Sequence, residues 1–190
     1  MGGMMATRNP ALFLFACTIL ASAAALIAAP QSLAPYVPTP QPVVEKMLEL
    51  AEVTAKDVVY DLGCGDGRIV ITAANRYGAH AVGVDIDPER IQESTANAKA
   101  AGVEKLVTFR LEDARKVDVS PATVVTLYLL SSSNAALRPI LTRQLKAGAR
   151  IVSHAFDMGD WQPLKTEHVD GDSGFRRTIY LWIADGKVRP

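Results

Sequence analysis

The stretch that decides the fold is Val58-Val59-Tyr60-Asp61-Leu62-Gly63-Cys64-Gly65-Asp66-Gly67-Arg68-Ile69. An apolar run is followed by three glycines at alternate positions and then by a helical pattern, so the stretch predicts a strand, a tight turn and a helix. Glycine tolerates the backbone angles of such a turn and lets a ligand approach the main chain closely. A glycine turn can also do no more than join a strand to a helix.

The spacing of Gly63, Gly65 and Gly67 narrows the class of ligand. It is GxGxG, whereas a dinucleotide-binding turn has GxGxxG, and no GK[ST] follows that would make a nucleotide P-loop. The carboxylate of Asp66 would also repel a pyrophosphate. The turn therefore favours a ligand that contains adenosine but no phosphate.

Acidic residues stand where they could hold the rest of such a ligand. Asp61 lies two residues before the first glycine, where a carboxylate can organise the turn and face a cationic amine. Asp85 ends the next apolar run, 18 residues beyond Gly67, where an acid can accept hydrogen bonds from ribose hydroxyls, although it could also only cap the helix that follows. Glu112 and Asp113 follow a third run and could accept from an adenine amino group, and Ile86 could pack on the adenine ring. Asp113 could equally be a plain surface acid.

The rest of the chain alternates between strand and helix patterns on both sides of this stretch. The pattern predicts helices at 43–51, 67–77, 87–101 and 134–145, and strands at 57–62, 81–85, 106–111, 123–130, 149–154, 164–169 and 176–184. Alternating strands and helices predict an α/β fold with a parallel sheet and helices on both faces. The last two strands are joined by a turn signal at 170–174, which predicts an antiparallel hairpin at one edge.

The first forty residues carry a single charged side chain, Arg8, and contain an uncharged, mostly apolar run from Ala11 to Ala29. As a helix this run of 19 residues would be about 28 Å long, close to the thickness of a bilayer core. It predicts a single-pass transmembrane anchor or a cleaved secretory signal, and a buried helix is the third reading. The position of Arg8 favours an N-terminus in the cytoplasm and a domain outside, but one arginine decides the side of the membrane weakly.

Composition excludes several classes of protein. The chain has 20 basic and 20 acidic residues, so it lacks the basic excess with which a protein neutralises nucleic-acid phosphates. Cys17 and Cys64 cannot build a disulfide scaffold, and no CxxC, HExxH or histidine cluster indicates a metal site. We therefore expect no metal and no nucleic-acid partner. The sequence gives no indication of the oligomeric state.

Residues 57–155 resemble a class I S-adenosylmethionine-dependent methyltransferase. The resemblance rests on three motifs in order, which are Asp61 to Gly67, Val82 to Asp85, and Glu112 to Ala114. It implies a Rossmann-like seven-stranded sheet of order 3-2-1-4-5-7-6 with an antiparallel seventh strand, and S-adenosyl-L-methionine as cofactor. By this resemblance the cofactor site comprises Asp61, Gly63, Cys64, Gly65, Gly67, Asp85, Ile86, Glu112 and Asp113, to which we add Thr126.

A narrower resemblance is to small N-terminally anchored methyltransferases. This group includes mitochondrial protein-lysine methyltransferases that act on inner-membrane proteins, and bacterial relatives of unassigned substrate. It rests on the segments 36–40, 125–130 and 156–161. It implies that Tyr36 and Thr39 cover the cofactor, and that the substrate is a lysine of a membrane-associated protein. The fourth strand lacks the Asn/Asp-Pro-Pro-Tyr with which amide- and adenine-modifying enzymes hold a planar amino group, which further disfavours a nucleic-acid base.

The sequence thus predicts an anchor or signal at 1–30, a proline-rich strap at 31–42 and a methyltransferase domain at 43–190. A lysine amine must be neutral to accept a methyl group, and an apolar site would lower its pKa without a strong base. Tyr128 and Asp157 are our candidates for orienting the acceptor, although Tyr128 could be a core aromatic residue. We expect His154 to be packed and Trp161 to anchor its loop. A small-molecule acceptor and a non-catalytic cofactor-binding protein remain open.

Overall fold

A single seven-stranded sheet runs through the part of the chain that the computed structural model describes, residues 1–2, 32–170 and 176–190. Its strand order is β3-β2-β1-β4-β5-β7-β6, which confirms the predicted order. The strands are β1 (Val58–Leu62), β2 (His80–Asp85), β3 (Val107–Leu111), β4 (Val124–Leu127), β5 (Arg150–His154), β6 (Lys165–Asp170) and β7 (Arg176–Ile183). The helices are α1 (Gln41–Leu50), α2 (Arg68–Tyr77), α3 (Pro88–Ala100) and α4 (Ser131–Gln144).

The first five strands are parallel, and β7 is antiparallel to both β5 and β6. In the ladders around β1, Asp61 pairs with Gly83 of β2 on one side and with Thr126 of β4 on the other. The order of the strands changes direction between β1 and β4. In an open parallel sheet, a ligand binds beyond the carboxyl ends of the strands at such a point.

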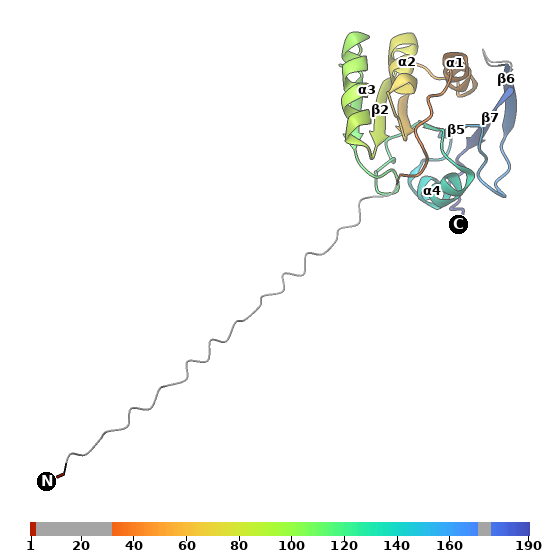
Figure 1. Cartoon of the computed structure of the whole chain (residues 1–190). Coiled ribbons are helices and arrows are strands. Elements are labelled where there is room, and N and C mark those ends of the chain that lie inside the picture. The colour runs from red at the N-terminus through yellow and green to blue at the C-terminus, as the bar shows by residue number, and fades with distance from the viewer. Residues whose placement is uncertain (3–31, 171–175) are drawn as a thin grey trace.

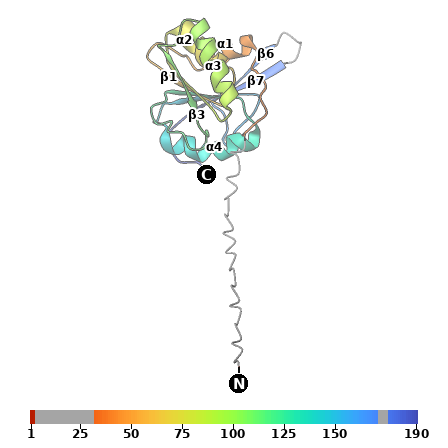
Figure 2. The same ribbon diagram turned by 60° about the vertical axis from the view of Figure 1, so that its left-hand side comes forward.

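Helices cover both faces of the sheet, as predicted. Figures 1 and 2 show α1, α2 and α3 on one side and α4 on the other. The side chains of β1 alternate accordingly: Val59 packs in the core under α1 and α2, and Tyr60 packs in the core under α4. Strands covered on both faces are apolar at nearly every position, which is why all four residues of β4 are buried and all except Thr126 are apolar.

The largest difference from the predicted boundaries lies between β4 and α4. The strand ends at Leu127 and the helix begins at Ser131, three residues before the predicted start. An apolar run has no periodicity that marks where its strand conformation ends. Leu129 lies in the loop beyond the strand, but its side chain is buried in the core under α4. Its apolar character therefore reflects burial and does not indicate strand conformation.

The proline-rich strap forms no helix or strand from Ser32 to Pro40, and α1 begins at Gln41 with Pro42 in its first turn, slightly earlier than predicted. The predicted anchor or signal from Ala11 to Ala29, with Cys17, lies outside the described residues. Within the described ranges, no helix has the length and apolar character needed to cross a bilayer. Within the same ranges, no group of three or more His, Cys, Asp or Glu side chains could hold a metal ion.

Candidate functional site

A cavity of about 310 Å³ opens at the carboxyl ends of β1, β2 and β4, under the strap. Its lining brings together most of the predicted site residues, although they come from segments far apart in the sequence. These are Tyr36, Thr39, Asp61, Gly63, Cys64, Gly65, Asp85, Ile86, Glu112, Asp113 and Tyr128. Three predicted residues, Gly67, Thr126 and Asp157, do not line it.

The three glycines of the turn have positive φ angles, and two of them are needed for different reasons. A Cβ atom at Gly65 would lie 2.5 Å from the ring of Tyr36, so this glycine makes room for the strap. A Cβ atom at Gly67 would lie 2.8 Å from Phe109 and 2.9 Å from Ser94. Gly67 therefore serves the packing of α2 against β3 and α3, and the cavity does not involve it.

Asp85 organises the glycine turn from the end of β2. One carboxylate oxygen accepts from the N–H of Gly65 at 2.9 Å, and the other accepts from the N–H of Asp87 at 3.0 Å. The cap of α3 is Asp87, whose side chain accepts from the N–H of Glu89, so Asp85 is not that cap. Each oxygen of Asp85 keeps a lone pair that can accept from a ribose hydroxyl.

Asp61 is buried at the end of β1, next to the turn. Thr126 of β4 donates a hydrogen bond of 2.7 Å to its Oδ1 atom. Burial raises the pKa of Asp61 to about 7, against the effect of the Thr126 hydroxyl and with support from the charges of Asp85 and Asp66. Thr126 thus acts on the cavity through Asp61. A cation bound beside Asp61 would favour its ionised form.

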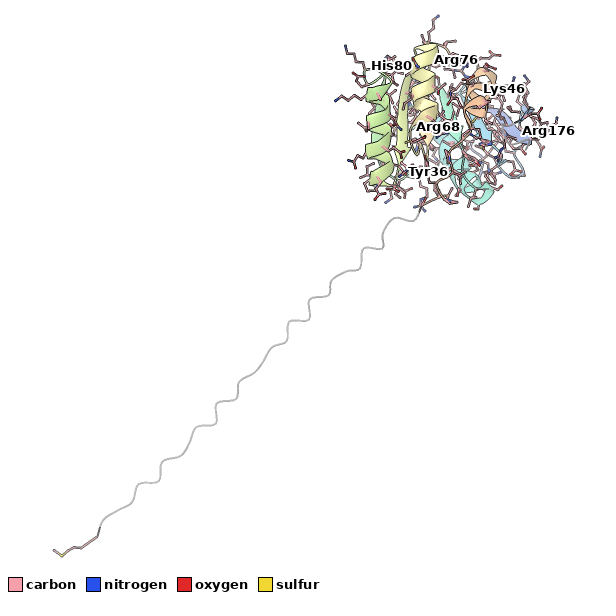
Figure 3. The ribbon with its side chains drawn as sticks, turned by 45° about the horizontal axis from the view of Figure 1, so that its top comes forward. Tyr36, Lys46, Arg68, Arg76, His80 and Arg176 are labelled. Carbon is pink, nitrogen blue, oxygen red and sulfur yellow. The ribbon has the colours of Figure 1, made fainter. Side chains whose placement is uncertain are left out.

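The strap forms one wall of the cavity from Ser32 to Thr39. Arg68 ties it to the glycine turn: its Nη1 atom donates to the carbonyl of Thr39 at 2.8 Å, and its Nε atom donates to Asp66 at 3.0 Å. Figure 3 shows Arg68 and Tyr36 where α2 approaches the strap. The guanidinium of Arg90 lies 4.6 Å from the ring centre of Tyr36 and holds it over the turn.

At the predicted adenine side, Asp113 accepts hydrogen bonds from the backbone and guanidinium of Arg115, and this arginine lowers its pKa. Asp113 is therefore ionised and fixed in place at the cavity wall. The N–H of Glu112 donates to the carbonyl of Asp85, which keeps the ends of β2 and β3 in register beside Ile86. The roles of these three side chains toward an adenine stay predictions.

At the other end of the cavity, Tyr128 is half-buried and its ring lies 3.9 Å from that of His154. His154 is packed, as expected: it is buried, its Nδ1 atom lies 3.4 Å from the hydroxyl of Thr39, and burial, supported by the charge of Arg177, lowers its pKa to about 4. Asp157 is exposed and accepts from the N–H of Gly159, a turn contact outside the lining.

Sequence reasoning missed Arg68, Arg90 and Leu129, which also line the cavity. Arg68 follows the last glycine directly, so its position in the motif was a usable signal. Arg90 had no signal, because its partner Tyr36 is 54 residues away in the sequence. Trp161, as expected, anchors its loop, since its carbonyl accepts from the indole N–H of Trp182 at 2.7 Å.

The charges of the lining indicate which ligand fits. Six acidic side chains line the cavity, from Asp61, Asp66, Asp85, Asp87, Glu112 and Asp113, and Asp61, with its pKa of about 7, is only partly ionised at neutral pH. The two guanidinium groups there are already paired, Arg68 with Asp66 and Arg90 with Glu93. Buried Cys64 stays a neutral thiol, since burial and then Asp61 raise its pKa. Such a cavity suits a ligand that is cationic and carries no phosphate, and S-adenosylmethionine is a ligand of this kind.

Comparisons with known proteins agree with this geometry. The family model of the ANTKMT methyltransferase domain matches residues 61–165. A protein-lysine N-methyltransferase of Saccharolobus islandicus is 47% identical over 150 residues, which cover 78% of this chain and 92% of that protein. The adenine nucleotide translocase lysine N-methyltransferase of Mus musculus is 34% identical over 131 residues, which cover 68% of this chain but only 56% of the mouse protein.

A solved structure is similar over nearly all of its length. It is named an RNA methyltransferase from Salinibacter ruber in complex with S-adenosyl-L-homocysteine, and it is 53% identical with a TM-score of 0.76. The match covers 80% of this chain and 97% of that one. S-adenosylhomocysteine is what S-adenosylmethionine becomes after losing its methyl group. The chain therefore belongs to the ANTKMT methyltransferase domain family, and it is an S-adenosylmethionine-dependent methyltransferase.

Proposed function

We propose that the protein transfers a methyl group to the side-chain amine of a lysine in a protein substrate. The observation that carries this proposal is the charge of the cavity, where six acidic side chains outnumber two guanidinium groups that are already paired. A cationic lysine side chain is attracted to such an opening, whereas a phosphate chain is repelled. The similarity to the archaeal protein-lysine N-methyltransferase over 92% of its length supports the same choice.

In methyl transfer the main task of the protein is to orient the donor and the acceptor. S-adenosylmethionine supplies an electrophilic methyl group on a sulfonium, so the acceptor needs only a free electron pair placed in line with it. A free lysine has a pKa of about 10.4, and its ammonium must first lose a proton to solvent. Tyr128 and the buried Leu129 present an apolar surface at this end of the cavity. Removal of water there lowers the pKa of the amine.

Tyr128 is the side chain best placed to orient the acceptor. It lies just beyond β4, lines the cavity and is half-buried, so its phenol can meet both the cavity and an entering side chain. Asp157 is exposed and lies outside the lining, so its role as an orienting group would require it to contact the substrate outside the cavity. Neutral His154, with its pKa near 4, cannot be charged at neutral pH and adds no repulsion toward a cationic cofactor.

The experiment that tests the proposal follows the methyl group. The purified protein is incubated with tritiated S-adenosylmethionine and, separately, with the proteins, RNA and small molecules extracted from its host. We expect the label in protein, and peptide mass spectrometry then finds a gain of one or more methyl groups on a lysine. The variant Asp85→Ala is the control for cofactor-dependent transfer.

RNA is the second candidate acceptor, because the protein of the 53% identical structure is named an RNA methyltransferase. Label found in RNA and absent from protein would overturn the lysine proposal. Label confined to small molecules would do the same. Binding of the cofactor without any transfer would favour a non-catalytic role.

We further propose that the substrate is membrane-associated and that the run from Ala11 to Ala29 holds the protein at the membrane. The apolar character and length of that run support this proposal. Fractionation of cells that express the full chain tests it, with the variant lacking residues 11–29 as the control. We expect the full chain in the membrane fraction and the shortened chain in the soluble one. If cells that express the full chain instead export a protein of lower mass, the run is a cleaved signal.

A further inference from the structure

The chain makes a strained turn directly after β5. Ala155 has a φ angle of 65°, which side chains other than glycine rarely adopt. The N–H of Phe156 donates to the carbonyl of His154 at 2.8 Å, which closes a three-residue turn of the rare, strained γ type. Such strain persists only where surrounding contacts enforce it, and it concentrates at functional sites.

Asn134 of α4 provides the contacts that enforce this turn. Its Nδ2 atom lies 3.1 Å from each of three oxygens, the hydroxyl of Ser153 and the carbonyls of Phe156 and Asp157. Because carbonyl oxygens only accept hydrogen bonds, the atom that faces them is the amide nitrogen. Asn134 thus ties the end of β5 to the loop that follows the turn.

Asn134 also leaves a polar atom buried without a partner in the described part of the chain. The side chain is fully buried, and its Oδ1 atom has no hydrogen-bond partner among the described residues. A buried oxygen without a partner loses the hydrogen bond it would make to water. Neither this unpaired oxygen nor the strained Ala155 improves packing. Both features therefore indicate that function requires this particular conformation of the loop.

The loop places an aromatic ring beside the cavity. The ring of Phe156 stacks against that of Tyr128, with centres 6.2 Å apart and planes 26° from parallel. Tyr128 lines the cavity and also lies against His154, which contacts Thr39 of the strap. The ends of two neighbouring parallel strands, β4 and β5, therefore carry one aromatic surface, and its inner end is part of the cavity wall.

We propose that Asn134 is a positioning residue for the methyl acceptor: it holds the turn at 154–157 so that Phe156 and Tyr128 form the face on which the acceptor side chain lies. This rests on the proposed function in one respect, that the acceptor is a lysine. The four methylene groups of a lysine pack on an aromatic face, and its ammonium is attracted to the same face until it loses its proton. The ring pair also excludes water from the amine.

Three variants test the proposal. Asn134→Asp keeps the shape of the side chain but replaces the donor with a carboxylate that the two carbonyl oxygens repel. Phe156→Leu removes the outer ring, and Phe156→Tyr keeps it. The dissociation constant for S-adenosylhomocysteine is measured by calorimetry, and kcat and KM are measured with the protein that carries the label in the experiment above.

We expect Asn134→Asp and Phe156→Leu each to lower kcat/KM for the acceptor at least tenfold, with the S-adenosylhomocysteine constant within twofold of the wild-type value. Phe156→Tyr restores kcat/KM to within threefold. The double variant is no worse than the poorer single variant, because both changes disturb the same surface. A loss that belonged only to folding would appear as a lower unfolding temperature together with weaker binding of S-adenosylhomocysteine.

The proposal is overturned if Phe156→Leu leaves kcat/KM unchanged, or if the S-adenosylhomocysteine constant rises in parallel with the loss of activity. The half-buried Phe156 keeps the test decisive even if Asn134→Asp fails to fold. If the label is found in RNA, the proposed function fails, and the same variants measured on RNA decide the role of Asn134 separately.

Discussion

The hydroxyl of Thr126 donates a hydrogen bond of 2.7 Å to the carboxylate of Asp61, and both side chains are buried where β1 and β4 lie side by side. This contact fixes an acid at the point where the sheet changes direction, next to the glycine turn. The acid has little access to water, so its charge depends on what occupies the cavity.

The first prediction concerns pH and stability. Asp61 has a pKa of about 7 in the folded protein and about 3.8 when unfolded, so the folded state binds more protons between these values. Stability of the cofactor-free protein therefore falls as the pH rises from about 4 to 7, by at most about 4 kcal/mol at about 1.4 kcal/mol per pKa unit. Asp61→Asn, which can still accept from Thr126, removes this fall.

Thermal unfolding at pH 5 and pH 8 measures the effect as the difference between wild type and Asp61→Asn. Other titrating groups are common to both proteins and cancel. We expect the variant to gain stability relative to wild type at pH 8 and to bind S-adenosylhomocysteine more weakly. Equal slopes of stability against pH in the two proteins would show that Asp61 titrates normally.

The second prediction concerns Asp85. Replacement by alanine removes one hydrogen bond to the glycine turn at Gly65, one to the backbone of Asp87, and the predicted acceptor for a ribose. We expect Asp85→Ala to raise the dissociation constant for S-adenosylhomocysteine at least tenfold, as measured by calorimetry. Asp118→Ala is the matched control, because Asp118 is exposed and lies outside the cavity. An unchanged constant in Asp85→Ala would contradict the assignment of the ribose.

The third prediction separates two glycines of one turn. Gly65→Ala would place a Cβ atom 2.5 Å from the ring of Tyr36, so we expect a displaced strap and weaker binding of S-adenosylhomocysteine, by about tenfold. Gly67→Ala would press on Phe109 and Ser94 between α2, β3 and α3, so we expect a loss of about 2 kcal/mol in stability. Chemical denaturation and calorimetry on both variants measure the two effects, and the reverse pattern would contradict our reading of the turn.

The fourth prediction concerns the strap. Arg68 joins the carbonyl of Thr39 to the carboxylate of Asp66, so Arg68→Ala should release the strap from the glycine turn. We expect S-adenosylhomocysteine to dissociate from Arg68→Ala at least fivefold faster than from wild type in stopped-flow measurements. The dissociation rate of Arg68→Lys should lie between these two. Arg76→Ala is the control, since Arg76 lies on the same helix but pairs with Glu45 outside the cavity. Equal dissociation rates for all four proteins would exclude the strap as a barrier to release.

Asp61 and Asp85 could be placed from the sequence because they end apolar runs, and the ends of parallel strands meet at one edge of the sheet. Gly67 belonged to the same motif, yet its lack of a side chain is required by Phe109, which is 42 residues away. A motif shows which positions need glycine. It does not show which neighbouring side chain fills the space that a Cβ atom would take.

The sequence by itself determined the order of strands and helices, the antiparallel hairpin at the end and the acids that surround the glycine turn. These features follow from short-range patterns, namely the periodicity of apolar residues, the residues that form turns, and the positions of acidic residues at the ends of apolar runs. Only the tertiary structure decided that Thr126 acts through Asp61, that Arg68 fastens the strap, and that Asn134 holds Phe156 against Tyr128. Each of these contacts joins residues that are distant in sequence or that depend on the path of a loop. Such contacts are set by how the layers pack, and the sequence pattern carries no record of that packing.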